Sequence, residues 1–179
     1  MHGLVCLLPS PLYGEVEGVW YELEEHCGLN GIRVTPYPHF SWCIAQGYEE
    51  AELKRIVEEI ARSAEPFEVW TAGIGIFTGV KPVIYIPVVK TRQLVGLHET
   101  IWKATGEALT GMAGHYGPGC YMPHISLAYE DVDEARLKCA MQRLAFRDFS
   151  RKFEVNNISF IYEPEGQTGE LKFSVYFNR

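Results

Sequence analysis

The sequence predicts an α+β fold built as an internal duplication, and two repeated features predict it. A His-x-Ser motif occurs at residues 39–41 and again at 124–126, each inside an apolar run that is typical of a β-strand. The tripeptide Phe-Glu-Val begins 28 residues after His39 and 29 residues after His124. An amphipathic helical pattern lies between each motif and its tripeptide. Because the motifs, their spacings and the helical patterns recur in the same order, they indicate a repeated unit of strand–helix–strand–helix–strand–strand.

The first part of the chain carries clear signals for its elements. Residues 4–8 are apolar and are ended by prolines, which cannot donate to a strand ladder. A helix with one apolar face begins at residue 12 and is stopped by the glycines of 27–31. In the next helix, Leu53, Ile56 and Ile60 recur at helical intervals. We expect helices from residue 12 and at 49–62, and strands at 4–8, at 39–45, from 67 and at 83–89.

Similar signals recur along the second part of the chain. Thr91 is a suitable N-cap for a helix whose buried face carries Leu94. Residues 111–119 are glycine-rich and predict a flexible loop. They do not predict a phosphate-binding P-loop, because a strand rather than a helix follows them. Asp131 with Glu134 predicts a capping box that opens another helix. Strands are expected around the second motif, from residue 153 and at 171–177.

The charge of the chain argues against an extended nucleic-acid surface. Of 179 residues, 16 are Lys or Arg and 23 are Asp or Glu, which gives a formal net charge of −7. A protein that tracks a long nucleic acid usually carries a basic stripe. Glutamates crowd residues 15–25 and basic residues crowd 136–152, and we interpret both groups as solvated helix faces. A phosphate-bearing ligand is therefore expected to be small or a strand end, held by local donors.

Composition also indicates in which cellular compartment the protein is expected. No apolar run reaches the ~18–20 residues of a membrane helix. Residues 1–8 lack the basic flank of a signal peptide. The five cysteines are odd in number and scattered, which argues against a disulfide framework and against a Cys-x-x-Cys zinc site. We therefore expect a cytoplasmic protein without membrane contacts, and a monomer.

The two His-x-Ser motifs together predict chemistry. Side chains alternate along a strand, so His39 and Ser41 project from one face, as do His124 and Ser126. Duplicated halves usually pack about a pseudo-two-fold axis, which would bring both motifs to one site. Two imidazoles there can take a proton from a nucleophile and give one to a leaving oxygen. The two hydroxyls can donate hydrogen bonds to phosphate oxygens. One such motif alone is more often a polar pair in a core, and the pairing favours a function.

The segments Pro38-His39-Phe40-Ser41 and Pro123-His124-Ile125-Ser126 resemble the paired motifs of the two-histidine (2H) phosphoesterase superfamily. Within it, the chain is most similar to the bacterial and archaeal proteins called 2′-5′ RNA ligases or RNA 2′,3′-cyclic phosphodiesterases. The resemblance covers almost the whole chain. It implies a single domain with a bilobal, LigT-like fold, in which two antiparallel sheets flanked by helices surround a central cleft. The motif halves are then roughly 1–82 and 83–179.

The resemblance also implies residue roles and a reaction. His39 and His124 are implied as the acid–base pair, with His124 preferred as the base although the reverse is open. Ser41 and Ser126 are implied as the phosphate ligands. The implied reaction is the opening of a 2′,3′-cyclic phosphate on an RNA end or a nucleotide by water, commonly to a 2′-phosphate, with no metal or cofactor. A phosphate-binding module without turnover and a reversible 2′-5′ RNA ligase are the alternatives.

Four other residues near the motifs are weighed against simpler roles. His115 lies in the glycine-rich loop and is interpreted as a surface residue rather than a substrate contact. Trp42, Tyr129 and Tyr162 lie on or near the expected strands and are able to stack a nucleobase. Core packing is the default interpretation for all three aromatic residues.

Overall fold

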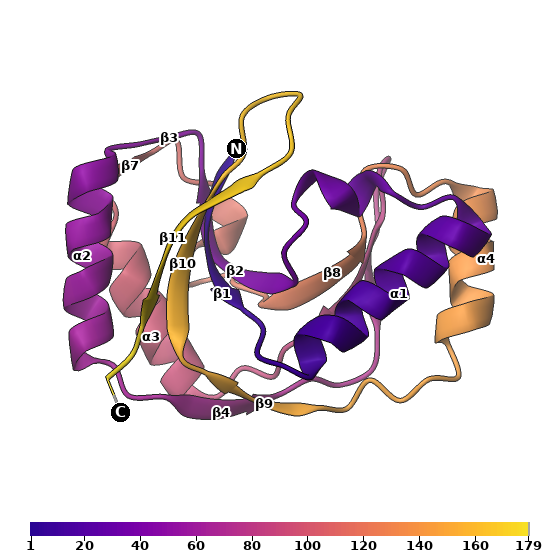
Figure 1. The fold of residues 1–179 in the computed structure, drawn as a ribbon, viewed down its shortest axis with the longest axis horizontal. Helices are drawn as coiled ribbons and strands as arrows, with labels where there is room; N and C mark the ends of the chain where they lie inside the picture. Colours follow the sequence, from indigo (N-terminus) through magenta and orange to yellow (C-terminus); the bar gives the residue numbers. More distant parts are fainter. Residues whose placement is uncertain (179) are drawn as a thin grey trace.

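The computed structural model describes residues 1–178 and has the predicted α+β architecture (Figure 1). The helices in this range are α1 (Leu12–Cys27), α2 (Glu50–Ser63), α3 (Arg92–Ala104) and α4 (Glu134–Leu144), with 3-10 turns η1 (Gly31–Val34) and η2 (Gly114–Tyr116). The strands are β1 (His2–Leu7), β2 (His39–Ala45), β3 (Gly47–Tyr48), β4 (Phe67–Trp70), β5 (Gly75–Phe77), β6 (Val83–Pro87), β7 (Leu109–Thr110), β8 (His124–Ala128), β9 (Lys152–Val155), β10 (Asn157–Tyr162) and β11 (Glu170–Tyr176). The expected helices and strands all form.

The main sheet is antiparallel, and the two motif strands lie side by side in its middle. The order is β11-β10-β1-β2-β8-β6-β5. The central strands β2 and β8 share a single register pair, Phe40 with Ile125. A four-stranded sheet and a three-stranded sheet are therefore joined at this pair, which gives the two sheets that the sequence analysis expected. Short ladders of β3 with β7 and of β4 with β9 complete the fold.

The repeated tripeptides lie beside each other in space. Strands β4 and β9 pair antiparallel, so that Phe67 faces Val155 and Glu68 faces Glu154. The central residues of both Phe-Glu-Val copies are thus directly opposite, as are the central residues of both His-x-Ser motifs. Equivalent residues of the two copies therefore pair with each other in both ladders. This arrangement is the one that an internal duplication produces.

Each side of the sheet draws elements from both halves of the sequence. Strand β5 of the first half pairs with β6 of the second half, and β10 of the second half pairs with β1 of the first. The helices also pack on strands of the other half, because α1 packs on β8 and α3 packs on β2. In Figure 1, α2 and α3 lie on one side of the molecule and α1 and α4 on the other. Elements from before and after residue 83 are therefore mixed on each side of the sheet.

Four strands had no clear signal in the sequence. Strand β5 is three residues long, and β3 and β7 are two residues long each. Five of the six residues in β10 are buried, so this strand lacks the polar–apolar alternation of a half-exposed strand. Short or fully buried strands give little periodicity to detect.

The start of α4 differs from the prediction. Its N-cap is Asp133, whose side chain accepts a hydrogen bond from the backbone N–H of Arg136 at 2.8 Å. Asp131 lies too early to cap this helix. Its carboxylate instead accepts hydrogen bonds from the backbone N–H groups of Asn30 and Gly31, at 2.7 and 2.8 Å. The prediction that Asp131 caps α4 is therefore wrong, and Asp131 holds the loop before η1. The predicted Thr91 cap of α3 is confirmed.

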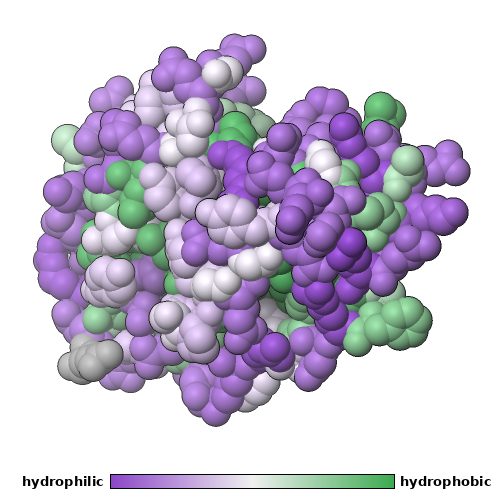
Figure 2. Space-filling view, turned by 45° about the vertical axis from the view of Figure 1, so that its right-hand side comes forward, coloured by the Kyte–Doolittle hydropathy of each residue, from purple (hydrophilic) through white to green (hydrophobic). Residues whose placement is uncertain are grey.

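The acidic and basic helix faces are matched to each other. Glu22 of α1 pairs with Arg143 and Arg147, and Glu15 of α1 pairs with Arg151. The sequence analysis interpreted both faces as solvated, but these ion pairs join the two faces to each other. Their mutual pairing also leaves less of the basic cluster available for steering an anionic ligand. Elsewhere, polar side chains cover most of the face shown in Figure 2, and apolar residues form only small patches on it.

The scattered cysteines, which argue against a disulfide framework, nevertheless form one bridge. A disulfide joins Cys27 at the end of α1 to Cys139 in α4, across a sequence separation of 112 residues. An odd, scattered set of cysteines argues against a framework of bridges, but the packing of α1 beside α4 brings this one pair together. Cys6 and Cys43 are buried free thiols, and Cys120 is an exposed one.

Within residues 1–178, no helix is long and apolar enough to cross a membrane.

The disulfide is expected to stabilise the packing of α1 on α4. Cys27→Ser should lower the free energy of unfolding by about 2–5 kcal/mol, because the open chain gains conformational freedom over a long loop. Denaturant unfolding of the variant and of the oxidised protein measures the difference. Cys120→Ser, which removes an exposed free thiol, is the matched control. Equal stability of Cys27→Ser and the control would show that the bridge does not form in solution.

Candidate active site

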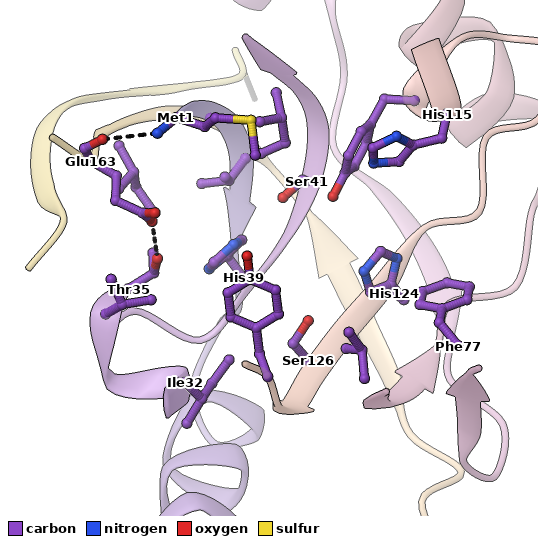
Figure 3. Close-up of a pocket in the computed structure, with 18 of the residues that line it drawn as sticks. Met1, Ile32, Thr35, His39, Ser41, Phe77, His115, His124, Ser126 and Glu163 are labelled. Carbon is purple, nitrogen blue, oxygen red and sulfur yellow. Dashed lines mark hydrogen bonds between the residues drawn. The ribbon is translucent and has the colours of Figure 1, made fainter. Parts of the chain in front are cut away.

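The pairing of β2 with β8 places both motifs at one pocket. Phe40 and Ile125 are opposite each other and both are 0% exposed, so they point into the core. Their neighbours along each strand point to the other face. His39, Ser41, His124 and Ser126 all line a pocket of about 560 Å³ on that face, and Figure 3 shows both imidazoles reaching into it. The predicted convergence of the four side chains is therefore present.

A β-bulge follows each motif at the same position. Between the Leu4–Cys43 and Val5–Ser41 pairs, β2 has one extra residue, Trp42. Between the pairs of β6 with β8, the extra residue is Leu127, directly after Ser126. A bulge reverses the side-chain alternation and bends the strand. Beyond the bulge in β2, Ile44 rather than Cys43 lines the pocket. In β2 the bulge thus ends the polar part of the strand, and Ile44 begins an apolar wall.

Both imidazoles are oriented by the same local hydrogen bond. Nδ1 of His39 lies 2.5 Å from the carbonyl oxygen of Tyr37, and Nδ1 of His124 lies 2.7 Å from that of Met122. A carbonyl oxygen only accepts, so Nδ1–H must be the donor in each ring. When a ring is neutral, its Nε2 is then a proton acceptor. Each motif therefore offers one Nε2 atom for proton transfer.

Burial in the pocket wall lowers the pKa of both imidazoles. Desolvation is the main cause that lowers the pKa of His39, from 6.5 to about 4. The hydrogen bond to Tyr37 acts in the opposite direction, and the nearby His124 lowers the pKa further. Desolvation also lowers the pKa of His124, with a smaller contribution from His115. Since a buried cation is costly, an anion in the pocket would favour protonation of both rings.

The backbone of each motif is anchored from outside its sheet. The indole Nε1–H of Trp20 in α1 donates to the carbonyl oxygen of Ser126 at 3.0 Å. The hydroxyl of Tyr121 donates to the carbonyl oxygen of Ser41, also at 3.0 Å. Tyr121 in turn stacks on the buried His98, with ring centroids 3.6 Å apart. His98 therefore has a structural role.

The structure shows which of the other candidate residues line the pocket and which do not. Trp42 is fully buried and packs in the core, and Tyr162 stacks on His2 outside the pocket lining. Tyr129 does line the pocket. His115, which the sequence analysis interpreted as a surface residue, is exposed but also lies on the pocket wall above His124 (Figure 3). The glycine-rich loop thus contributes to the site.

Several pocket residues had no signal in the sequence. Phe77 packs edge-on against His124, with ring centroids 4.9 Å apart. Thr35 and Glu163, which are 128 residues apart in sequence, meet at the opposite end of the pocket. Only the folded arrangement brings such isolated residues together. Of the described residues, none that lines the pocket is a Lys or Arg. In the same range, no group of three or more His, Cys, Asp or Glu side chains is placed to hold a metal ion.

Two histidines and two serines, presented to one pocket by duplicated antiparallel strands, define the class of two-histidine phosphoesterases. The chain belongs to the 2′-5′ RNA ligase superfamily, whose sequence profile matches residues 9–167. The resemblance inferred from the motifs is thereby confirmed.

Individual relatives agree with this membership. A protein of Bacillus cytotoxicus, whose name assigns it provisionally to the phosphoesterases, is 27% identical over 149 residues, covering 78% of this chain and 82% of its own. The solved structure of TT0787 from Thermus thermophilus has a TM-score of 0.67 at 18% identity, covering 98% of this chain and 97% of its own. Escherichia coli LigT, solved with 3′-AMP, has a TM-score of 0.57 at 9% identity, covering 99% and 98%. These two structures share the fold of this chain.

The lowered pKa of His39 predicts a pH dependence of stability. Between about pH 4 and 6.5, the unfolded chain binds a proton at this position that the folded state does not bind. The free energy of unfolding therefore rises with pH across this window, by at most about 1.4 kcal/mol per pH unit for one histidine. His39→Gln should show a smaller rise between about pH 5 and about pH 7 in urea unfolding. His26→Gln, at an exposed position of α1, should keep the full rise. An unchanged rise in His39→Gln would contradict the burial effect.

Proposed function

We propose that the protein is a metal-independent phosphodiesterase that opens 2′,3′-cyclic phosphates by water, with a 2′-phosphate as product. The observation that carries the proposal is the shared pocket, in which two oriented imidazoles and two hydroxyls face one another. This set supplies one group to accept a proton, one to donate a proton, and hydrogen-bond donors for the phosphate oxygens.

The reaction proceeds in one balanced displacement at phosphorus. One Nε2 accepts a proton from water as the water oxygen forms a bond to phosphorus. The bond from phosphorus to the 3′ oxygen breaks, and the other imidazolium gives that oxygen its proton. The hydroxyls of Ser41 and Ser126 donate to the non-bridging oxygens, where charge develops. Proton exchange with solvent then restores the starting state of both rings.

The lowered pKa of His39 supports one assignment of the two histidines. The base must be neutral before reaction and the acid must be protonated. The pKa of His39 is lowered to about 4, so this ring is suited to accept a proton. We therefore propose His39 as the base and His124 as the acid, which reverses the preference drawn from the motif resemblance.

The pocket supports a small substrate or a single RNA end. It holds about 560 Å³, and its described lining contains no Lys or Arg to follow a polyphosphate backbone. The E. coli structure with 3′-AMP shows that a protein of this fold accommodates a nucleotide monophosphate. A role in processing RNA ends is consistent with superfamily membership. Joining RNA ends by a 2′-5′ linkage would need a second RNA end in the same pocket, which makes hydrolysis the favoured direction.

Both histidines should be essential for turnover. His39→Ala and His124→Ala are each expected to lower kcat on a 2′,3′-cyclic nucleotide by about 10²- to 10⁴-fold with the fold intact. Ser41→Ala and Ser126→Ala should each lose about 10²- to 10³-fold. EDTA should leave the rate unchanged. His26→Ala is the control for loss of a histidine outside the pocket. Tight binding of the nucleotide with no product from the unaltered protein would indicate a binding module instead.

A substrate with a good leaving group can separate the base from the acid. A 4-nitrophenolate leaving group needs no proton, so loss of the acid matters little for its departure. We expect His124→Ala to retain far more activity on a 4-nitrophenyl nucleotide diester than on a cyclic nucleotide. His39→Ala should lose activity on both. The opposite pattern in steady-state rates would restore His124 as the base.

A further inference from the structure

The pocket extends from the motif strands across β1 to the end of β10. Gly3 and Val5 of β1 form its floor, and Ile44 and Ile161 continue its wall. A side chain at Gly3 would place its Cβ 3.0 Å from Cδ1 of Ile44, so glycine leaves the floor open there. Ile32 and Val34 of η1 also line this region. A flat floor and aliphatic walls suit a planar, apolar-faced group such as a nucleobase.

One carboxylate lies at the end of this apolar region. Glu163 is the only Asp or Glu among the described residues that line the pocket. Its carboxylate accepts a hydrogen bond from the hydroxyl of Thr35, as Figure 3 shows. Its backbone N–H donates to Nδ1 of His2 at 3.2 Å, which fixes where the side chain begins. An ionised carboxylate has about four acceptor sites, so the bond from Thr35 leaves capacity for a ligand.

The carboxylate and the motif side chains lie at different ends of the same pocket. Glu163 follows the last residue of β10, and β1 lies between β10 and β2. Because Val5 pairs with both Ser41 and Ser159, Glu163 is also displaced along the strand direction from Ser41. With the phosphate between the imidazoles, a ribose and a base would extend along the apolar walls toward Glu163. This separation also limits repulsion between the carboxylate and the anionic phosphate.

We propose that Glu163, positioned by Thr35, recognises the guanine base of the substrate, an inference that rests on the proposed function. Guanine presents N1–H and N2–H side by side, which matches a carboxylate with two parallel hydrogen bonds. Adenine and cytosine place a ring acceptor beside their amino group, and uracil flanks its single N–H with two carbonyl oxygens. Each of these acceptors would face the carboxylate unfavourably, because a buried unpaired acceptor is costly. The substrate class is therefore a guanosine 2′,3′-cyclic phosphate or an RNA that ends in one.

The test compares base preference in matched variants. The ratio of kcat/KM for guanosine over uridine 2′,3′-cyclic phosphate is expected to be about 10- to 100-fold in the unaltered protein. Glu163→Gln keeps an oxygen that accepts from Thr35 but presents an amide donor to the base, and the ratio should fall to near one. Glu165→Gln removes the same charge two residues further along the exposed hairpin and should keep the ratio. A ratio near one in the unaltered protein, or a preserved ratio in Glu163→Gln, would overturn the proposal.

A binding measurement distinguishes this proposal from the proposed function. Calorimetric titration of the same three proteins with 2′-GMP and with 2′-UMP requires no turnover. Tighter binding of 2′-GMP that is lost in Glu163→Gln supports guanine recognition even where no cyclic phosphate is opened. Equal affinity for both nucleotides in all three proteins rejects it, whatever the catalytic result. Absence of hydrolysis with a guanine preference in binding would instead reject the proposed function alone.

Discussion

The site depends on one backbone constraint, the antiparallel pairing of Phe40 with Ile125. This single register pair joins the two sheets and sets which face each motif presents. A slip of one residue in either strand would turn its histidine and serine toward the core. The register is supported on both sides, since Trp20 and Tyr121 bind the motif carbonyl oxygens from elements outside the sheet. The paired bulges at Trp42 and Leu127 then confine the polar groups to a short segment of each strand.

The second constraint is electrostatic and follows from the first. Two imidazoles converge on a pocket whose described lining contains no Lys or Arg. Burial lowers the pKa of both rings, and an anion in the pocket would raise it again, so protons taken up by the histidines would balance part of the anion's charge. Ligand binding and protonation are then linked, and the proton needed by the leaving oxygen is bound together with the substrate. In a pocket that already held a guanidinium, that fixed charge would balance the anion, and ligand binding would be less strongly linked to protonation of the histidines.

Sequence reasoning predicted the repeated motifs and the strongly periodic helices. It missed the residue pairs that only folding brings together. The spacing of Phe67 and Phe153 from their motifs revealed the duplication, and the amphipathic pattern and Thr91 cap predicted their helices. Asp131 and Asp133 are both reasonable caps by composition, and only the backbone geometry at α4 decides between them. The Cys27–Cys139 bridge and the Thr35–Glu163 contact join residues more than 100 positions apart. Such contacts leave no local pattern, because each partner is ordinary within its own segment.

The exchange of strands between the two sides of the sheet has a consequence for biosynthesis. Strand β1 is made before the other strands of the sheet and pairs with β2 on one edge, but the partner for its other edge is β10, which is made after β2 and β8. An apolar strand edge therefore stays open until most of the protein has been made, and such an edge is prone to pair with other chains. Neither half of the duplicated chain can complete its own sheet. The open edge of β1 is therefore closed only when β10 has been made and has folded onto it.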